Sequence, residues 1–233
     1  MALNSIKDLV LPLSEVAYGH IREAILDGTF PAGQPLRQAD IAKQLEVSRV
    51  PVREALKRLE SEGLIELRPR RGFAVAALDG AAITDLLDVC RALESQAGYQ
   101  AALHRTTEEV DALALIMERM NREAERVRAG CDLSELSTWA MLHRQFHDRM
   151  FASSGRKNLC RFIHGVRDQV DWYIRYMVAR TGYLSDATGE HEALFEAFQS
   201  GDAPALSHLC AEHVEKTCHQ LLTLIEEGHL GNR

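Results

Sequence analysis

IAKQLEVSRVPVREALKRLE, residues 41–60, decides the fold, because its pattern predicts two short helices joined by a tight turn. Apolar residues recur on one face of each predicted helix. Ser48 is a favourable N-cap for the second helix, since its hydroxyl can accept a free backbone N–H. Pro51 costs little in the first turn, where its missing N–H has no partner within the helix. Arg49 and Arg53 then lie near the start of the second helix.

Two short helices with arginines at the start of the second are typical of a DNA-reading helix-turn-helix. The planar guanidinium of Arg49 or Arg53 can bond both O6 and N7 of guanine, or bind a phosphate. The alternative is an ordinary amphipathic helix pair with a solvated basic face.

The residues around this stretch resemble a known family. VSRVPVREALKRLESEGLI, the upstream LDGTFPAGQPLRQADIA and the downstream RPRRGFAV are similar to the winged helix-turn-helix of GntR-type bacterial transcription regulators, over roughly residues 13–78. The resemblance implies that Arg37, just before the first helix of the motif, contacts phosphate or base. Gln38 stands where the family usually has an acidic residue.

A β-hairpin is expected after the second helix of the motif. Strand-like runs at Leu64–Leu67 and Phe73–Ala77 flank the sequence PRRG. Arg70 and Arg71 lie at the expected tip, and Gly72 permits the turn, so the hairpin would form a wing that enters a minor groove or holds phosphates. The alternative is a solvated basic turn.

The composition favours a cytoplasmic protein. No run of about 18 apolar residues is present, and the first residues lack a signal-peptide core. The five cysteines make an odd number without a C-x-x-C pair, which indicates reduced thiols. The net charge of −7 argues at first against nucleic acid. However, residues 1–78 carry 11 basic and 10 acidic side chains, so the acidic excess lies in residues 79–233.

The predicted fold is therefore mainly α, with two domains. Residues 1–78 would form the winged helix-turn-helix, with three helices and a β-hairpin, and residues 79–233 an all-α bundle. The first helix is expected at Leu13–Leu26, with Gly28 ending it. Amphipathic patterns and turn signals predict six bundle helices, at about 80–103, 107–129, 132–153, 157–180, 190–200 and 203–227.

Four histidines are expected to point into the bundle. His143 and His147 are four residues apart and therefore only about 40° apart around one helix. His191 and His213 fall on the apolar faces of two further helices. A single inward histidine is usually a hydrogen-bonded core residue, but four that converge indicate a metal site, because imidazole is a common ligand of transition metals. By contrast, His164 (on a face with Arg167) and His208 are expected to be solvated.

The bundle also resembles a known domain, the ligand-binding FCD domain of the FadR subfamily. HRQFH, EHEALFEA and EHVEK, which contain the four histidines, match its metal-binding pattern, except that His143 stands where the family usually has Asp. An all-imidazole set would favour a divalent transition metal such as zinc or nickel. Arg91 and Glu94 match the R-x-x-LE of the domain. A buried Arg91 would need an anion, either Glu94 or the carboxylate of an effector.

The expected function is a metabolite-responsive, DNA-binding transcription regulator rather than an enzyme. Its partners would be a palindromic double-stranded DNA operator, a small organic or sugar acid that binds at the metal site, and a second copy of the chain in a homodimer. Two alternatives stay open: a metal-dependent enzyme in a helical bundle, and a metal-free regulator that binds an acyl ligand. Against the enzyme, Glu192 points about 100° away from His191 around its helix, so no general base is evident.

Overall fold

The structure is a computed structural model that describes residues 12–26, 28–76, 80–129, 133–181 and 187–226. The chain divides into two compact units, Met1–Ala77 and Leu78–Arg233. Nine helices and three short strands form the described part of the chain, so the mainly α fold class predicted from the sequence is confirmed. In that same part, no helix has both the length and the apolar content to cross a membrane.

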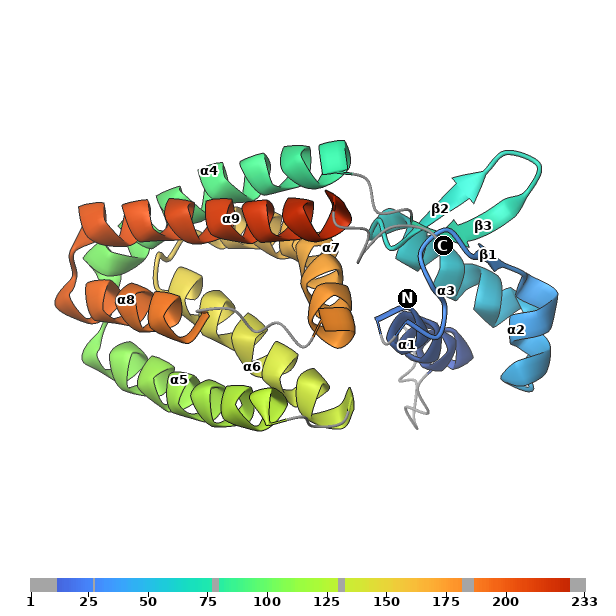
Figure 1. Cartoon of the computed structure of the whole chain (residues 1–233), viewed down its shortest axis with the longest axis horizontal. Helices are drawn as coiled ribbons and strands as arrows, with labels where there is room; N and C mark the ends of the chain where they lie inside the picture. The colour runs from blue at the N-terminus through green and yellow to red at the C-terminus, as the bar shows by residue number, and fades with distance from the viewer. Residues whose placement is uncertain (1–11, 27, 77–79, 130–132, 182–186, 227–233) are drawn as a thin grey trace, which may run out of the picture. The chain divides into compact units, whose positions relative to one another are not determined.

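The N-terminal unit is a winged helix-turn-helix, in which three helices pack against a small sheet (Figure 1). Its elements in chain order are α1 (Leu13–Leu26), β1 (Pro35–Leu36), α2 (Gln38–Gln44), α3 (Arg49–Ser61), β2 (Ile65–Arg68) and β3 (Gly72–Val75).

The turn between α2 and α3 depends on one residue in the left-handed region. Glu46 has φ 54°, and the N–H of Val47 bonds the carbonyl of Ala42 at 3.0 Å. This is a helix end closed by a left-handed residue, which caps carbonyls that the last turn leaves without partners. It explains why the helical pattern breaks at these positions in the sequence.

The wing is a three-stranded antiparallel sheet of order β1-β3-β2. Arg68 pairs with Gly72 across the hairpin, and Arg70 and Gly72 have φ values of 64° and 81°. The hairpin was predicted, but β1 was not, because Pro35 lies in a turn-rich stretch. A two-residue edge strand tolerates this proline, whose nitrogen has no hydrogen to donate to the sheet.

Polar contacts tie α1 to α3 over an apolar core. Arg58 donates to Glu15 at 2.7 Å and its guanidinium carbon lies 3.9 Å from the centroid of the Tyr18 ring. The hydroxyl of Tyr18 donates to Glu62 at 2.8 Å. The guanidinium of Arg58 therefore binds side chains within the N-terminal unit, whereas Arg49 and Arg53 of the same helix are exposed.

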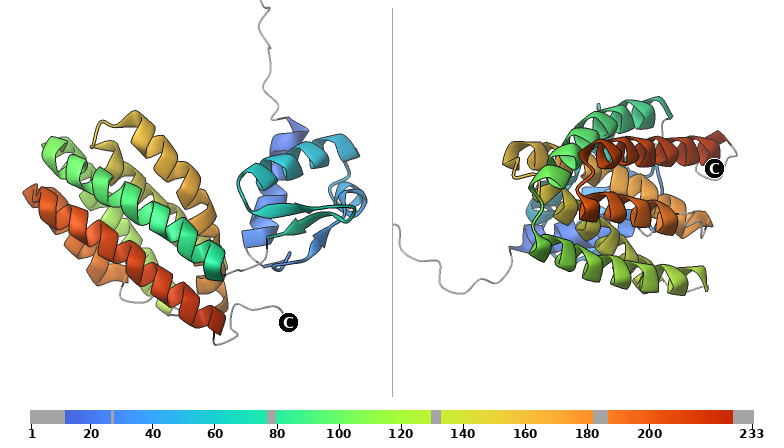
Figure 2. Two further views of the ribbon diagram at one scale, coloured as in Figure 1. Left: turned by 90° about the horizontal axis from the view of Figure 1, so that it is seen from above. Right: turned by 90° about the vertical axis from the view of Figure 1, so that its left-hand side faces the viewer.

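The C-terminal unit is an all-α bundle of long helices (Figures 1 and 2). Its elements lie within two residues of most predicted boundaries and are α4 (Gly80–His104), α5 (Thr107–Arg128), α6 (Leu133–Ala152), α7 (Lys157–Thr181), α8 (Ala187–Ser200) and α9 (Ala203–Glu226). α4 runs beside α9 and α5 beside α6, while α7 packs against α4 and α6.

Gly98 allows α4 and α9 to approach closely. A Cβ at this position would lie 2.7 Å from Sγ of Cys210 and 3.3 Å from the carbonyl oxygen of Leu206. Both distances are shorter than ordinary contacts, so any larger residue would push the two helices apart. Since α9 carries His213, the close contact at Gly98 helps to fix the position of His213 along the bundle axis.

Candidate functional site

Two arginines of α3, Arg49 and Arg53, point to solvent without a hydrogen-bond or ion-pair partner among the described residues. Ser48 is the N-cap of α3, with extended backbone angles of φ −72° and ψ 165°, but its side chain makes no capping hydrogen bond. The expected capping bond is therefore wrong, and the exposed Ser48 directly precedes Arg49 in the sequence.

The remaining residues expected at the DNA interface are also on the surface. Arg37 is exposed at the N-cap of α2 and makes no capping hydrogen bond there. Arg70, Arg71 and Gly72 are exposed at the tip of the wing. The N-terminal unit thus carries basic side chains on α3, before α2 and at the turn of the hairpin.

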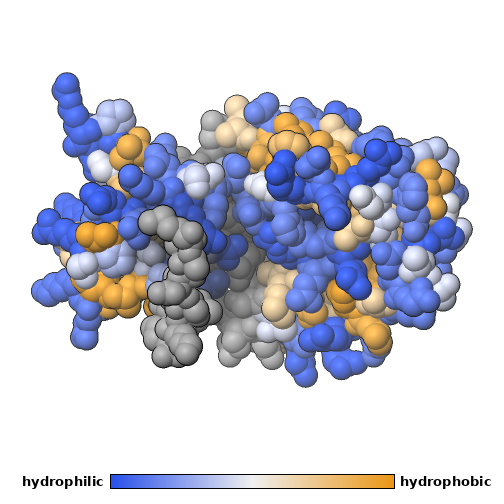
Figure 3. All heavy atoms as spheres, turned by 180° about the vertical axis from the view of Figure 1, so that it is seen from behind, coloured by the Kyte–Doolittle hydropathy of each residue, from blue (hydrophilic) through white to orange (hydrophobic). Residues whose placement is uncertain are grey.

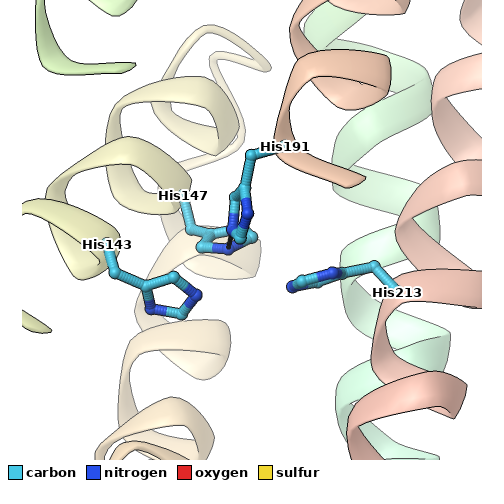
Figure 4. A group of neighbouring side chains, drawn as sticks. All are labelled: His143, His147, His191 and His213. Atoms are coloured by element: carbon cyan, nitrogen blue, oxygen red, sulfur yellow. Dashed lines mark hydrogen bonds between the residues drawn. The ribbon is translucent and has the colours of Figure 1, made fainter. Parts of the chain in front are cut away.

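The structure brings together all four inward histidines. His143 and His147 project from α6, His191 from α8 and His213 from α9 (Figure 4). One ligand nitrogen from each side chain lies within 4.8 Å of the corresponding nitrogens of the other three. No local stretch of sequence makes this cluster, because three helices contribute to it.

Burial and aromatic packing hold the rings in place. His143, His147 and His191 are 5%, 1% and 1% exposed. Trp139 stacks on His143 with 5.0 Å between ring centroids, and Phe146 meets the rings of His147 and His191 edge to face. Side chains fixed in this way keep their nitrogens in place before any ligand arrives.

One pair of these nitrogens is spaced as two ligands of one ion would be. Nε2 of His147 lies 3.1 Å from Nε2 of His191. Two nitrogens that each bind one zinc ion at about 2.0–2.1 Å lie about 2.9–3.4 Å apart at angles from 90° to tetrahedral. Nε2 of His147 has Nε2 of His191 as its neighbour, whereas Nδ1 of His147 is buried without a hydrogen-bond partner among the described residues. The residues present therefore fit a metal ion.

A carboxylate outside the cluster orients the fourth histidine. Nδ1 of His213 lies 2.7 Å from Oε2 of Glu190, and Nζ of Lys216 lies 3.6 Å from the other oxygen. Burial alone would raise the pKa of Glu190, but the His213 hydrogen bond and the Lys216 charge outweigh it and keep that pKa below its ordinary value. With the proton of His213 on Nδ1, Nε2 keeps its lone pair for a metal.

Burial disfavours the protonated form of two of the imidazoles. Burial lowers the pKa of His143 and of His147 well below the ordinary value, and the charges of His191 and Arg167 add to this effect. A neutral imidazole is the form that binds metal ions.

Family comparisons identify the chain. Residues 13–75 match the model described as bacterial regulatory proteins, gntR family, and residues 85–216, more than half of the chain, match the FCD domain. The chain belongs to the GntR family and carries an FCD domain. The family resemblance noted in the sequence is confirmed, and with it the assignment as a transcription regulator.

Relatives and solved structures agree with this assignment. The regulator is 32% identical over 140 residues to an uncharacterized HTH-type transcriptional regulator in the TAR-I ttuE-ttuC' intergenic region of Agrobacterium vitis, covering 60% of this chain and 80% of the relative. It is 25% identical to the HTH-type transcriptional repressor GlaR of Escherichia coli, covering 92% and 96%. E. coli McbR/YncC shares the fold, with a TM-score of 0.74 at 20% identity over 93% and 100% of the two chains.

Arg91 of this GntR regulator does not lie where the sequence predicted. It is exposed on α4, with 53% of its side chain accessible, and Nη2 lies 3.4 Å from Asp88. Its expected burial beside the histidines is wrong, because the apolar stripe of α4 faces away from it. Arg91 instead lines a surface groove between α4 and α9.

Arg167, which the sequence did not single out, is the buried arginine among the described residues of the bundle. Its Nη1 donates to Oε1 of Glu94 at 2.9 Å. Arg167 was expected to be solvated because it shares a helical face with His164, whose side chain is 53% exposed. His208 is 80% exposed, as expected. Glu94 could have indicated this pair, because an acid buried on α4 requires a basic partner, which here comes from another helix.

Proposed function

We propose that this GntR regulator is a homodimer that binds a two-fold symmetric operator through its N-terminal unit. In this proposal it senses a small organic or sugar acid at a divalent transition metal in the FCD domain. His143, His147, His191 and His213 would hold the ion, and zinc or nickel suits a set of four neutral imidazoles. A bound ion would supply positive charge to which a carboxylate oxygen can coordinate.

The convergence of the four buried histidines carries the sensing part of the proposal. Their ligand nitrogens lie within 4.8 Å of one another. Apolar packing alone does not require four imidazoles at one point, and each would cost free energy in the core without a partner. The hydrogen bond from His213 to Glu190 adds the outer carboxylate that commonly accompanies a metal-bound histidine.

The DNA part of the proposal assigns contacts to the exposed basic residues of the N-terminal unit. Arg49 and Arg53 would contact bases or phosphates from α3, with Ser48 at its start. The remaining contacts would come from Arg37 and from the wing residues Arg70, Arg71 and Gly72.

A dimer is proposed because a two-fold operator needs two reading units. The bundle surface offers apolar area for such a contact: Val89 and Leu103 on α4 and Phe162 on α7 are 45%, 54% and 59% exposed. Figure 3 shows hydrophobic patches within a mostly hydrophilic surface on the face of the bundle seen from behind. Light scattering at micromolar concentration tests this, since a dimer has twice the 26.1 kDa mass of the chain.

The sensing function is tested by a thermal-shift screen of organic and sugar acids on the full chain loaded with zinc. A ligand that binds only the folded protein raises its unfolding temperature. The acid should stabilise the wild type and change its affinity for operator DNA. His147→Ala should lose both responses, while His208→Ala, which removes an exposed histidine of α9, should keep them. An acid that stabilises all three proteins equally binds elsewhere and contradicts the proposal.

A further inference from the structure

One apolar side chain of α3 takes no part in the core. Val50 is the second residue of this helix, and it is 52% exposed. The other apolar residues of α3 are buried and form its core face: Pro51, Val52, Ala55, Leu56 and Leu59. Val50 therefore lies outside the face by which α3 packs on the rest of the N-terminal unit.

Helix geometry places Val50 at the middle of the outward face of α3. Successive residues turn by about 100° around an α-helix, so the five buried residues are centred about 170° away from Val50. Arg53 and Lys57 lie about 60° and about 20° from Val50 around the helix, and both are exposed. The valine side chain thus points away from the unit on the same surface as these basic residues.

The stability of the helix does not explain a valine at this position. A β-branched side chain loses rotamer freedom in a helix, so valine is a weaker helix former than alanine, lysine or glutamate. Its methyl groups gain nothing from the hydrophobic effect until another surface covers them. Single exposed apolar residues are common on protein surfaces, so the significance of Val50 comes from its place among the basic residues of α3.

The apolar group that DNA offers to such a helix is the methyl group of thymine. Residues near the N-terminus of a recognition helix contact base edges in the major groove. Arginine and lysine bind the acceptors of guanine or the phosphates there, whereas apolar side chains contact the C5 methyl of thymine. Valine has one restricted side-chain torsion, so the contact immobilises little.

We propose that Val50 reads a thymine in each operator half-site, through contact of its methyl groups with the C5 methyl of the base. This inference rests on the proposed binding of a two-fold operator by the N-terminal unit, and it names one base that each half-site contains. Cytosine has no C5 methyl, so the contact favours thymine over cytosine. Arg49 and Arg53 supply affinity for guanine or phosphate, and Val50 adds discrimination at an A·T pair.

The test compares thymine with uracil, which pair identically with adenine and differ only in the C5 methyl. An operator is first selected from a random duplex library with the wild-type full chain. Each thymine of this operator is then replaced in turn by deoxyuridine, at the same position of both half-sites. Gel-shift titrations give the affinity of the wild type, V50A and V16A for every duplex.

The two variants form a matched pair. Alanine is a better helix former than valine, so V50A should fold. Val16 on α1 is 40% exposed and lies outside the residues assigned to DNA, so V16A makes the same substitution away from the proposed contact. Circular dichroism is measured on all three proteins.

The contact predicts one thymine per half-site at which the methyl group matters. Deoxyuridine there should weaken binding by the wild type about fourfold per half-site, the factor for one buried methyl group, and about 16-fold for a dimer on both half-sites. V50A should bind the thymine operator more weakly by a similar factor and should not respond to uracil at that position. Either change removes the same interaction, so their effects should not add. V16A should match the wild type on every duplex.

Two results would overturn the role of Val50 alone: an enriched operator to which V50A responds as the wild type does at every thymine, or one at which no uracil weakens wild-type binding. A library from which the wild type enriches no sequence would overturn the operator proposal, and the role of Val50 with it.

Discussion

Glu190→Gln tests whether the carboxylate beside His213 serves a metal ion. Oε2 of Glu190 lies 2.7 Å from Nδ1 of His213, and only 16% of the Glu190 side chain is exposed. Glutamine preserves the shape and can still accept this hydrogen bond, but it loses the charge that about doubles its strength. Removing an outer-shell partner typically costs about 10–100-fold in metal affinity. We expect the lower end for glutamine, about tenfold or 1.4 kcal/mol, and about 100-fold for Glu190→Ala.

The assay is a zinc titration in competition with a chromophoric chelator at pH 7.5. Glu192→Gln is the matched control, because Glu192 is an exposed acid on the same helix, two residues away. It should keep the wild-type zinc affinity. If Glu190→Gln and Glu192→Gln bind zinc equally tightly, Glu190 does not orient a ligand and the reasoning from the 2.7 Å contact is refuted.

Three further outcomes follow from the structure. Arg53→Ala should cost about 1–3 kcal/mol of operator binding in a gel-shift titration if Arg53 reads a base, and unchanged affinity in the folded variant would remove it from the interface. Gly98→Ala should lower the free energy of unfolding in urea by about 1–3 kcal/mol, since its Cβ would lie 2.7 Å from a cysteine sulfur. Gly165→Ala should leave the free energy of unfolding unchanged, because a Cβ added at Gly165 would meet no neighbouring atom within 4 Å. In the metal-free protein, the lowered pKa values of His143 and His147 mean that the unfolded chain binds protons near pH 6.5 that the folded chain refuses. The free energy of unfolding should therefore fall as the pH decreases below about 6.5, and a flat urea-unfolding profile from pH 7.5 to 5.5 would contradict this.

Much of the fold could be predicted because helical periodicity is strong in this chain. α1 was expected at Leu13–Leu26, where it is observed. The convergence of the histidines also followed from periodicity, since each of the four shares a face with apolar residues of its own helix. The apolar face of each helix predicts which of its side chains point into the core. Because one bundle has a single small core, four inward imidazoles were expected to lie close together.

Periodicity was insufficient where a helix is covered on more than one side. Arg167 shares a face with His164, but α7 packs against both α4 and α6, so residues on nominally polar positions become buried. The same limit misplaced Arg91, which the motif R-x-x-LE associated with Glu94 although only Glu94 turns inward. Which arginine meets a buried acid depends on tertiary packing, and one helix at a time does not reveal it.

The metal content of the purified protein is the most direct test of the central claim. The chain should take up one equivalent of zinc or nickel, measured by mass spectrometry of the eluted metal after gel filtration. His147→Ala and His213→Ala should fall well below one equivalent, while His208→Ala should match the wild type. Wild-type protein that neither contains nor takes up a stoichiometric ion would contradict the claim, and the four histidines would then be core residues of the bundle.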